Sequence, residues 1–314
     1  MYKPAKPYKR KIIEAIRKTW RSPYVDVEFD TYPIFRKKTA YNKYKEVDHT
    51  DGIGTKGVYH WKRGTFHAAV MDALAMNLND LAIVRAVPYK LSNHVTMPVE
   101  DGRILRIVEA MAEECRIRKI AIVGGENSFH DNTEGLDISM TVSGFIKKPH
   151  INKCKSGDAL IGFKSSGLHS NGFTAVRKVF KKKTLPEFTV PTKIYLDTIL
   201  KLVEKYEVNG MMHITGGAFS KLKDILGPNL DAHIAHSKNT RPQKIFFDMY
   251  KKGLSNTAMY TTFNCGIGFV ISVLKKDAEK IVKTVPGTAI IGRVVKGSGR
   301  VFVESAFNKR QVIL

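Results

Sequence analysis

The chain contains little cysteine and no long apolar run. Its three cysteines, Cys115, Cys154 and Cys265, lie far apart and form no CxxC pattern, so we expect neither a disulfide framework nor a zinc site. Reduced thiols are typical of a cytoplasmic protein. No stretch of about 18 apolar residues is present, which argues against a membrane span. The first residues also lack the apolar segment of a secretory signal.

Acidic residues are scarce. The chain has 29 Asp and Glu against 52 Lys and Arg, a net charge of +23. Such an excess attracts nucleotides, phosphoribosyl groups and nucleic acids alike. A dedicated nucleic-acid module would gather its basic residues on one element and interleave aromatic ones. Here the basic residues are spread out, so we expect non-specific rather than specific nucleic-acid binding. Residues 1–22 are basic enough to suggest a mitochondrial targeting segment, but their low serine content makes this the second interpretation.

Hydrophobic patterning predicts a mixed α/β (α+β) fold with two domains, residues 1–150 and 151–314. A segment near 147–158, with a proline, a basic cluster and a Gly-Asp pair, marks the boundary. In the first half we predict helices at 9–20, 64–77 and 101–118, and strands at 119–123 and 137–146. In the second half we predict helices at 172–180, 194–206 and 218–226, and strands at 159–163, 266–274, 289–296 and 300–304. Residues 227–262 are expected to be irregular.

Residues 51–56 form the most informative motif, Asp51-Gly52-Ile53-Gly54-Thr55-Lys56. A phosphate–metal site uses these residue types. A carboxylate can bind Mg²⁺, bare glycine N–H groups can reach phosphate oxygens, and a lysine supplies a point charge. Alone, a short glycine-rich motif of this kind is weak evidence.

Further motifs follow in order along the chain. They are Asn79-Asp80-Leu81, Gly124-Gly125-Glu126-Asn127, His169-Ser170-Asn171-Gly172, His213-Ile214-Thr215-Gly216-Gly217 and Phe263-Asn264-Cys265-Gly266-Ile267-Gly268. The ordered set resembles the aminoimidazole ribonucleotide synthetase family, also called phosphoribosylformylglycinamidine cyclo-ligase. The resemblance extends over roughly residues 40–300. The motifs of the second half are the more specific ones.

The resemblance implies a two-domain ATP-binding synthetase. Its N-terminal sheet-plus-helices domain would bind ATP and metal and form a dimer barrel, and its C-terminal domain would be α/β. The implied reaction is the ATP-dependent ring closure of formylglycinamidine ribonucleotide to 5-aminoimidazole ribonucleotide in purine biosynthesis. The implied cofactors are ATP and Mg²⁺, the implied substrate is a phosphoribosyl compound, and the implied assembly is a homodimer. The alternative is a related phosphotransferase or ligase acting on a different amide or ribotide.

Matching the family motifs assigns three groups of residues. The implied Mg²⁺ ligands are Asp51, Asp80 and Glu126. The implied nucleotide and substrate contacts are Asp51, Gly52, Gly54, Thr55, Lys56, Asn79, Asn171, Thr215, Gly216, Gly217 and Asn264. The implied catalytic residues are His169, His213 and Lys56. Structural roles remain open for each, such as an Asx turn at Asp51, a cap at Asp80 or an ion pair at Glu126.

The first half departs from the family pattern at three places. The glycines usually found before the Asp-Gly motif are missing at 31–38. The usual aspartate is missing in the segment Leu91-Ser92-Asn93-His94, and the family sequence after Gly-Gly-Glu is replaced by Asn127-Ser128-Phe129-His130. These departures leave the expected fold unchanged and bear on the identity of the substrate.

Overall fold

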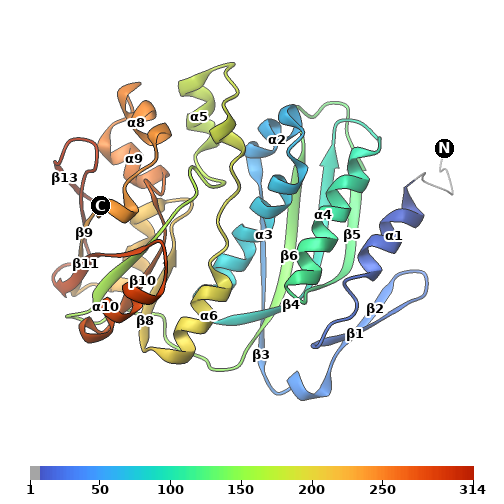
Figure 1. Ribbon diagram of the computed structural model, residues 1–314, viewed down its shortest axis with the longest axis horizontal. Coiled ribbons are helices and arrows are strands. Elements are labelled where there is room, and N and C mark those ends of the chain that lie inside the picture. The colour runs from blue at the N-terminus through green and yellow to red at the C-terminus, as the bar shows by residue number, and fades with distance from the viewer. Residues whose placement is uncertain (1–7) are drawn as a thin grey trace. The chain divides into compact units, whose positions relative to one another are not determined.

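The computed structural model describes residues 8–314, and the chain divides into two compact units, Met1–Lys148 and Pro149–Leu314 (Figure 1). Each unit combines a β-sheet with helices, which confirms the predicted mixed α/β fold. None of the helices in the described part of the chain is long and apolar enough to span a bilayer.

Unit 1 is built on a four-stranded sheet in the order β3-β6-β4-β5, in which only β4 and β5 run parallel. A separate hairpin of β1 and β2 precedes it. The elements are α1 (Lys9–Arg17), β1 (Val25–Phe29), β2 (Pro33–Lys37), β3 (Lys45–Gly52), α2 (Gly57–Arg63), α3 (Phe66–Ile83), β4 (Ala86–Met97), α4 (Arg103–Ile117), β5 (Ala121–Phe129) and β6 (Asp137–Ile146).

Helices α3 and α4 pack together and cover one face of this sheet (Figure 1). Alternation along the strands turns Met140, Val142 and Leu91 toward the helices, where they are fully buried. Helix α3 is rich in alanine and leucine and is buried on nearly all sides, because its small side chains let it lie close to the strands and to α4.

Unit 2 is built on a seven-stranded sheet in the order β13-β12-β9-β11-β7-β10-β8, in which only β9 and β12 run parallel. The elements are β7 (Ala159–Lys164), α5 (Phe173–Phe180), α6 (Leu196–Lys205), β8 (Val208–His213), α7 (Lys223–Leu226), β9 (Leu230–Ala235), α8 (Lys244–Lys251), α9 (Asn256–Thr262), β10 (Ile267–Val273), α10 (Lys275–Thr284), β11 (Thr288–Lys296), β12 (Val301–Glu304) and β13 (Gln311–Ile313).

The structure contradicts one expectation from the sequence and lengthens two predicted elements. Residues 227–262 are not irregular, since they form β9, α8 and α9. These elements span only 6 to 8 residues each, too short for a clear periodic signal beside Pro228 and Pro242. The predicted helix 64–77 continues to Ile83, so that Asn79 and Asp80 lie within the C-terminal end of α3, and the predicted strand 119–123 continues through Gly124-Gly125 to Phe129.

Candidate functional site

The motifs of unit 2 come together at one edge of its sheet. Residues 165–172 follow β7, residues 214–218 follow β8, and residues 263–266 precede β10. Since β10 runs antiparallel to both β7 and β8, these three loops share one edge. Hydrogen bonds join them: Ser165 N donates to Gly266 O at 2.9 Å, and Ile214 N donates to the backbone oxygen of Gly268 at 3.0 Å.

The two predicted catalytic histidines lie side by side beneath these loops. Their ring centroids are 6.4 Å apart, and His213 stacks on Phe269. Both imidazoles are fully buried. The backbone N–H of Ser166 donates to His169 Nε2 at 3.3 Å, so this nitrogen acts as an acceptor in a neutral ring. His169 thereby links the strand end to the start of the motif loop.

Three of the five non-glycine residues of unit 2 that adopt a positive φ lie in the same loops. His169 (φ 58°), Ala218 (φ 44°) and Cys265 (φ 44°) all occupy the left-handed region without being glycine. Each such residue is destabilising by roughly 1–3 kcal/mol, and residues of this kind persist mainly at ligand sites and active sites. Three of them on three neighbouring loops mark this sheet edge as the candidate binding site of unit 2.

The remaining motif residues of unit 2 fall into two groups. Gly216 and Gly217 are exposed, Asn171 is half-buried, and Thr215 is buried, where its Oγ1 accepts a hydrogen bond from Lys221 Nζ at 3.1 Å. Asn264 is buried and uses its amide within the protein. Its Nδ2 donates to Gly167 O at 2.8 Å, and its Oδ1 accepts from Gly266 N at 2.9 Å. Asn264 therefore holds two motif loops together, and its predicted ligand contact stays a prediction.

Gly268 and Gly216 have different roles: the first is required for packing, and the second leaves space for a ligand. A Cβ at Gly268 would lie 2.1 Å from Tyr195 Oη and 2.5 Å from His169 Cε1, whereas a Cβ at Gly216 would lie 4.0 Å from its nearest neighbour, Asn171 Oδ1. We expect Gly268→Ala to lower the free energy of unfolding by about 1–3 kcal/mol through overpacking. Gly216→Ala should change it by less than about 0.5 kcal/mol and should raise the substrate KM, because it fills the space over an exposed backbone.

Denaturant unfolding and steady-state kinetics of the two variants check this expectation. An unchanged KM for Gly216→Ala would show that no ligand approaches this backbone. Full stability of Gly268→Ala would contradict the packing role.

In unit 1, two of the predicted acids lie near one histidine. His49 donates from Nδ1 to Asn77 Oδ1 at 3.1 Å, and its Nε2 lies 3.3 Å from Asp80 Oδ2. The hydrogen bond to Asp80 raises the pKa of His49, opposed by partial burial and assisted by Asn77 and by the charge of Asp51. Asp80 lies against His49 and the charge of Asp51 adds to its effect, so this part of unit 1 favours positive charge.

The structure does not bring Glu126 to the same place. In the strand register, Asp51 of β3 lies opposite Met140 of β6, Met140 lies opposite Asn93 of β4, and Asn93 lies opposite Gly125 of β5. Three strand spacings, about 14 Å, therefore separate Asp51 from Gly125. Glu126, the next residue of β5, points to the opposite face, because successive side chains of a strand alternate. No group of three His, Cys, Asp or Glu side chains able to hold a metal occurs within residues 8–314.

The other predicted residues of the Asp-Gly motif differ in exposure. Gly54 and Thr55 are exposed, and Gly54 adopts a left-handed conformation (φ 54°). Asn79 is fully buried in α3. Lys56 is also fully buried, and its Nζ lies 2.7 Å from Asp72 Oδ2. A direct contact between Lys56 and a phosphate would therefore require this ion pair to open.

The three cysteines are free and buried. Burial raises the pKa of Cys115 to about 12 and that of Cys154 to about 11, and it raises the pKa of Cys265 well above its ordinary value. Because the thiolate is the nucleophilic form, Cys265 is a packing residue of its motif rather than a nucleophile.

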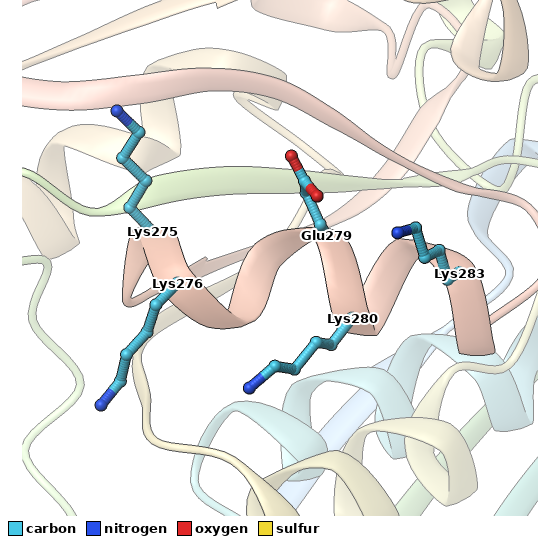
Figure 2. Close-up of a pocket in the computed structure, with 5 residues that line it drawn as sticks. All are labelled: Lys275, Lys276, Glu279, Lys280 and Lys283. Atoms are coloured by element: carbon cyan, nitrogen blue, oxygen red, sulfur yellow. The ribbon is translucent and has the colours of Figure 1, made fainter.

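A hollow on the surface of unit 2 has a different character. It measures about 700 Å³ and is lined by Lys275, Lys276, Glu279, Lys280 and Lys283 of helix α10. Figure 2 shows these side chains spreading away from one another around the helix. They supply positive charge without the glycine backbone and amide groups of the motif loops. The hollow therefore fits the non-specific attraction of anions, and the motif edge remains the candidate site.

Family models define the class of the protein. Residues 39–146 match the N-terminal domain of AIR synthase related proteins, and residues 155–304 match the C-terminal domain of the same proteins. Solved structures with the same fold include Escherichia coli hydrogenase maturation protein HypE (TM-score 0.68, 19% identity, 98% of this chain and 96% of that chain) and Aquifex aeolicus thiamine monophosphate kinase (TM-score 0.60, 20% identity, 98% and 99%). At this identity they show the fold alone.

Curated relatives narrow the class to one family. The phosphoribosylformylglycinamidine cyclo-ligase of Methanococcus maripaludis is 34% identical over 256 residues, covering 74% of this chain and 72% of that protein. The cyclo-ligase of Bacillus cereus strain Q1 is 34% identical over 284 residues, covering 82% of each. The chain belongs to the phosphoribosylformylglycinamidine cyclo-ligase family, which confirms the resemblance of its motifs.

Proposed function

We propose that the chain catalyses the ATP-dependent ring closure of formylglycinamidine ribonucleotide to 5-aminoimidazole ribonucleotide, a step of purine biosynthesis. The observation that carries the proposal is the 32–34% identity to curated cyclo-ligases over 74–82% of the chain. In this reaction ATP phosphorylates the formyl amide oxygen. An amidine nitrogen then attacks the activated carbon, and inorganic phosphate leaves as the ring closes. The enzyme mainly contributes positioning and charge stabilisation.

The motif edge of unit 2 is the proposed site for the phosphoribosyl substrate. Gly216 and Gly217 leave an exposed backbone that a phosphate can approach closely. Asn171 and Thr215 provide polar side chains beside it. The buried pair His169 and His213 supports the loops from below and is the proposed source of acid–base groups.

The end of β3 that carries Asp51, next to the exposed Gly54 and Thr55, is the proposed site for ATP and its metal. Asp51 and Asp80 fit Mg²⁺, which usually binds one or two carboxylates together with water and phosphate oxygens. Asp80 Oδ2 already lies 3.3 Å from His49 Nε2, and its hydrogen bond raises the pKa of that imidazole. When bound, Mg²⁺ would neutralise charge on the transferred phosphoryl group. Gly52, Gly54 and Thr55 would offer backbone and hydroxyl groups to the nucleotide, and Glu126 would serve a separate position on the other face.

A product assay tests the proposed function. Purified protein is mixed with ATP, Mg²⁺ and formylglycinamidine ribonucleotide, and both ADP and the aminoimidazole product are measured. Equal amounts of ADP and aminoimidazole support the cyclo-ligase. Protein that releases ADP with another amide or ribotide, and makes no aminoimidazole, supports the alternative phosphotransferase.

One observation favours keeping that alternative in the assay. Asn93 occupies the segment of β4 where the family usually has an aspartate. Its Nδ2 donates to Gly124 O at 3.3 Å, and a Cβ at Gly125 would approach that Nδ2 to 2.6 Å. A neutral amide is thus packed against the Gly-Gly backbone, in a segment that lacks the carboxylate usual in the family.

We also propose that the protein is a homodimer located in the cytoplasm. β3 and β5 are the edge strands of the four-stranded sheet of unit 1, whereas β6 is paired on both sides. Pairing of the edge strand β3 between two copies would remove unpaired backbone groups. We expect light scattering at micromolar concentration to give twice the chain mass of 35.3 kDa. A strictly monomeric mass would contradict the dimer. Reduced, buried thiols fit the proposed compartment.

A further inference from the structure

A fully buried charged cluster lies beneath residues 51–56. Lys56, Asp72 and His60 each have no exposed surface. Lys56 Nζ lies 2.8 Å from Asp72 Oδ1 and 2.7 Å from Oδ2. His60 Nε2 lies 2.8 Å from the same Oδ2, and its Nδ1 lies 2.8 Å from Thr65 Oγ1. Both carboxylate oxygens of Asp72 are thus bound within the protein.

The charges of this cluster depend on one another. Burial alone would raise the pKa of Asp72, but the Lys56 ammonium and the His60 hydrogen bond hold it well below its usual range. Burial lowers the pKa of Lys56, and the charge of Asp72 opposes this effect. Removing one partner would leave an uncompensated buried charge, which is strongly destabilising.

The cluster fixes the end of the Asp-Gly motif. Lys56 is the last residue of the 3₁₀ turn Gly54–Lys56, and α2 begins at the next residue. Gly57 packs so closely that a Cβ there would lie 1.8 Å from Leu136 O. At the other end of the motif, Asn77 Nδ2 donates to Asp51 O at 3.1 Å. Helix α3, which carries Asp72 and Asn77, therefore holds both ends of the segment.

We infer that Asp72 and His60 are positioning residues that use Lys56 as a buried anchor, so that the segment 51–56 presents Asp51 and the Gly54–Thr55 backbone to ATP. Lys56 acts on the nucleotide through the shape of the segment and not through contact with a phosphate. This inference rests on the proposed function, since it assigns ATP to this segment. Misplacing a binding segment by about 1 Å can lower a rate about 100-fold.

A double-mutant cycle on the ion pair tests the inference. We expect Lys56→Met and Asp72→Asn each to lower kcat/KM for ATP about 100-fold, and the double variant to lose little more than the worse single variant. Such non-additivity follows if Lys56 works only through Asp72. The inference is overturned if the folded double variant loses kcat/KM by the product of the two single losses. It is also overturned if Asp72→Asn has normal kinetics.

A milder variant keeps the test valid if these variants fail to fold. His60→Leu removes one hydrogen-bond donor of Asp72 and leaves both charges in place. We expect it to raise KM for ATP about tenfold, the effect of one lost hydrogen bond to a charged group, and to leave KM for the ribotide within about twofold. A general loss of structure would move both constants. Equal changes in both constants, or none in either, would therefore contradict the positioning role.

His67→Leu is the matched control. His67 also lies on the α2–α3 stretch and also contacts a carboxylate, Glu114 Oε1 at 2.8 Å, but its side chain is 58% exposed. We expect it to leave KM for ATP within about twofold of the wild-type value. Calorimetric titration with ATP alone separates the two proposals. Weaker ATP binding by His60→Leu supports the anchor even if the ribotide is not the substrate.

Discussion

Asp80→Asn is expected to abolish ATP turnover while leaving the fold of unit 1 intact. The substitution keeps the shape of a side chain that is 20% exposed on α3 and removes its negative charge. Mg²⁺ prefers carboxylate oxygens, and a metal ion contributes several kcal/mol to phosphoryl transfer. Loss of that contribution lowers kcat by about three orders of magnitude or more.

The measurement is steady-state ADP release at saturating ATP, with the Mg²⁺ concentration varied. Glu109→Gln on the neighbouring helix α4 is the control, because it removes an exposed carboxylate that no motif contains. Thermal unfolding of both variants should stay within a few degrees of the wild type. Wild-type turnover by a folded Asp80→Asn variant would remove Asp80 from the metal site.

The predictability of the fold depended on whether a strand shows apolar alternation. Strand β6 does, and the predicted range 137–146 matches its bounds. Strand β3 does not, because its helix-facing positions include the polar residues His49 and Asp51. Strand β4 contains Pro88 at a register shift, where a missing backbone N–H is tolerated. Two of the four strands were therefore not predicted: β3 because of its polar helix-facing residues, and β4 because of its proline and irregular pairing.

The sequence motifs identify the residues of the candidate site, but they do not predict how these residues lie relative to one another. The strands predicted at 159–163 and 266–274 place two of the three loops of unit 2 beside strand ends, whereas β8, which precedes the third loop, was not predicted. Strand register, which no short motif encodes, determines that Glu126 faces away from Asp51. Sequence reasoning also missed Asp72 and His60. One signal was available for Asp72: a single carboxylate in the apolar part of α3 must be paired if it is buried.

His169→Ala is expected to lower kcat/KM by roughly two or more orders of magnitude, the range for a positioned acid–base group. Besides the Ser166 N–H bond at 3.3 Å, His169 packs beside His213 and against Gly268. Its removal would therefore loosen the loop end as well as remove the imidazole. The helix α5 should persist, because it begins only at Phe173 and the Nε2 bond of His169 goes to Ser166 rather than to the helix.

His169→Gln distinguishes the two possible roles. A Gln side-chain oxygen can accept the Ser166 N–H bond in place of Nε2 but cannot exchange a proton near neutral pH. Partial recovery of kcat/KM relative to His169→Ala would assign the residue to hydrogen bonding of the loop, which its burial favours. No recovery would assign it to proton transfer. If His169→Ala itself keeps near-normal kinetics, His169 is only a turn residue, and the proton transfer falls to His213 or to groups of the substrate.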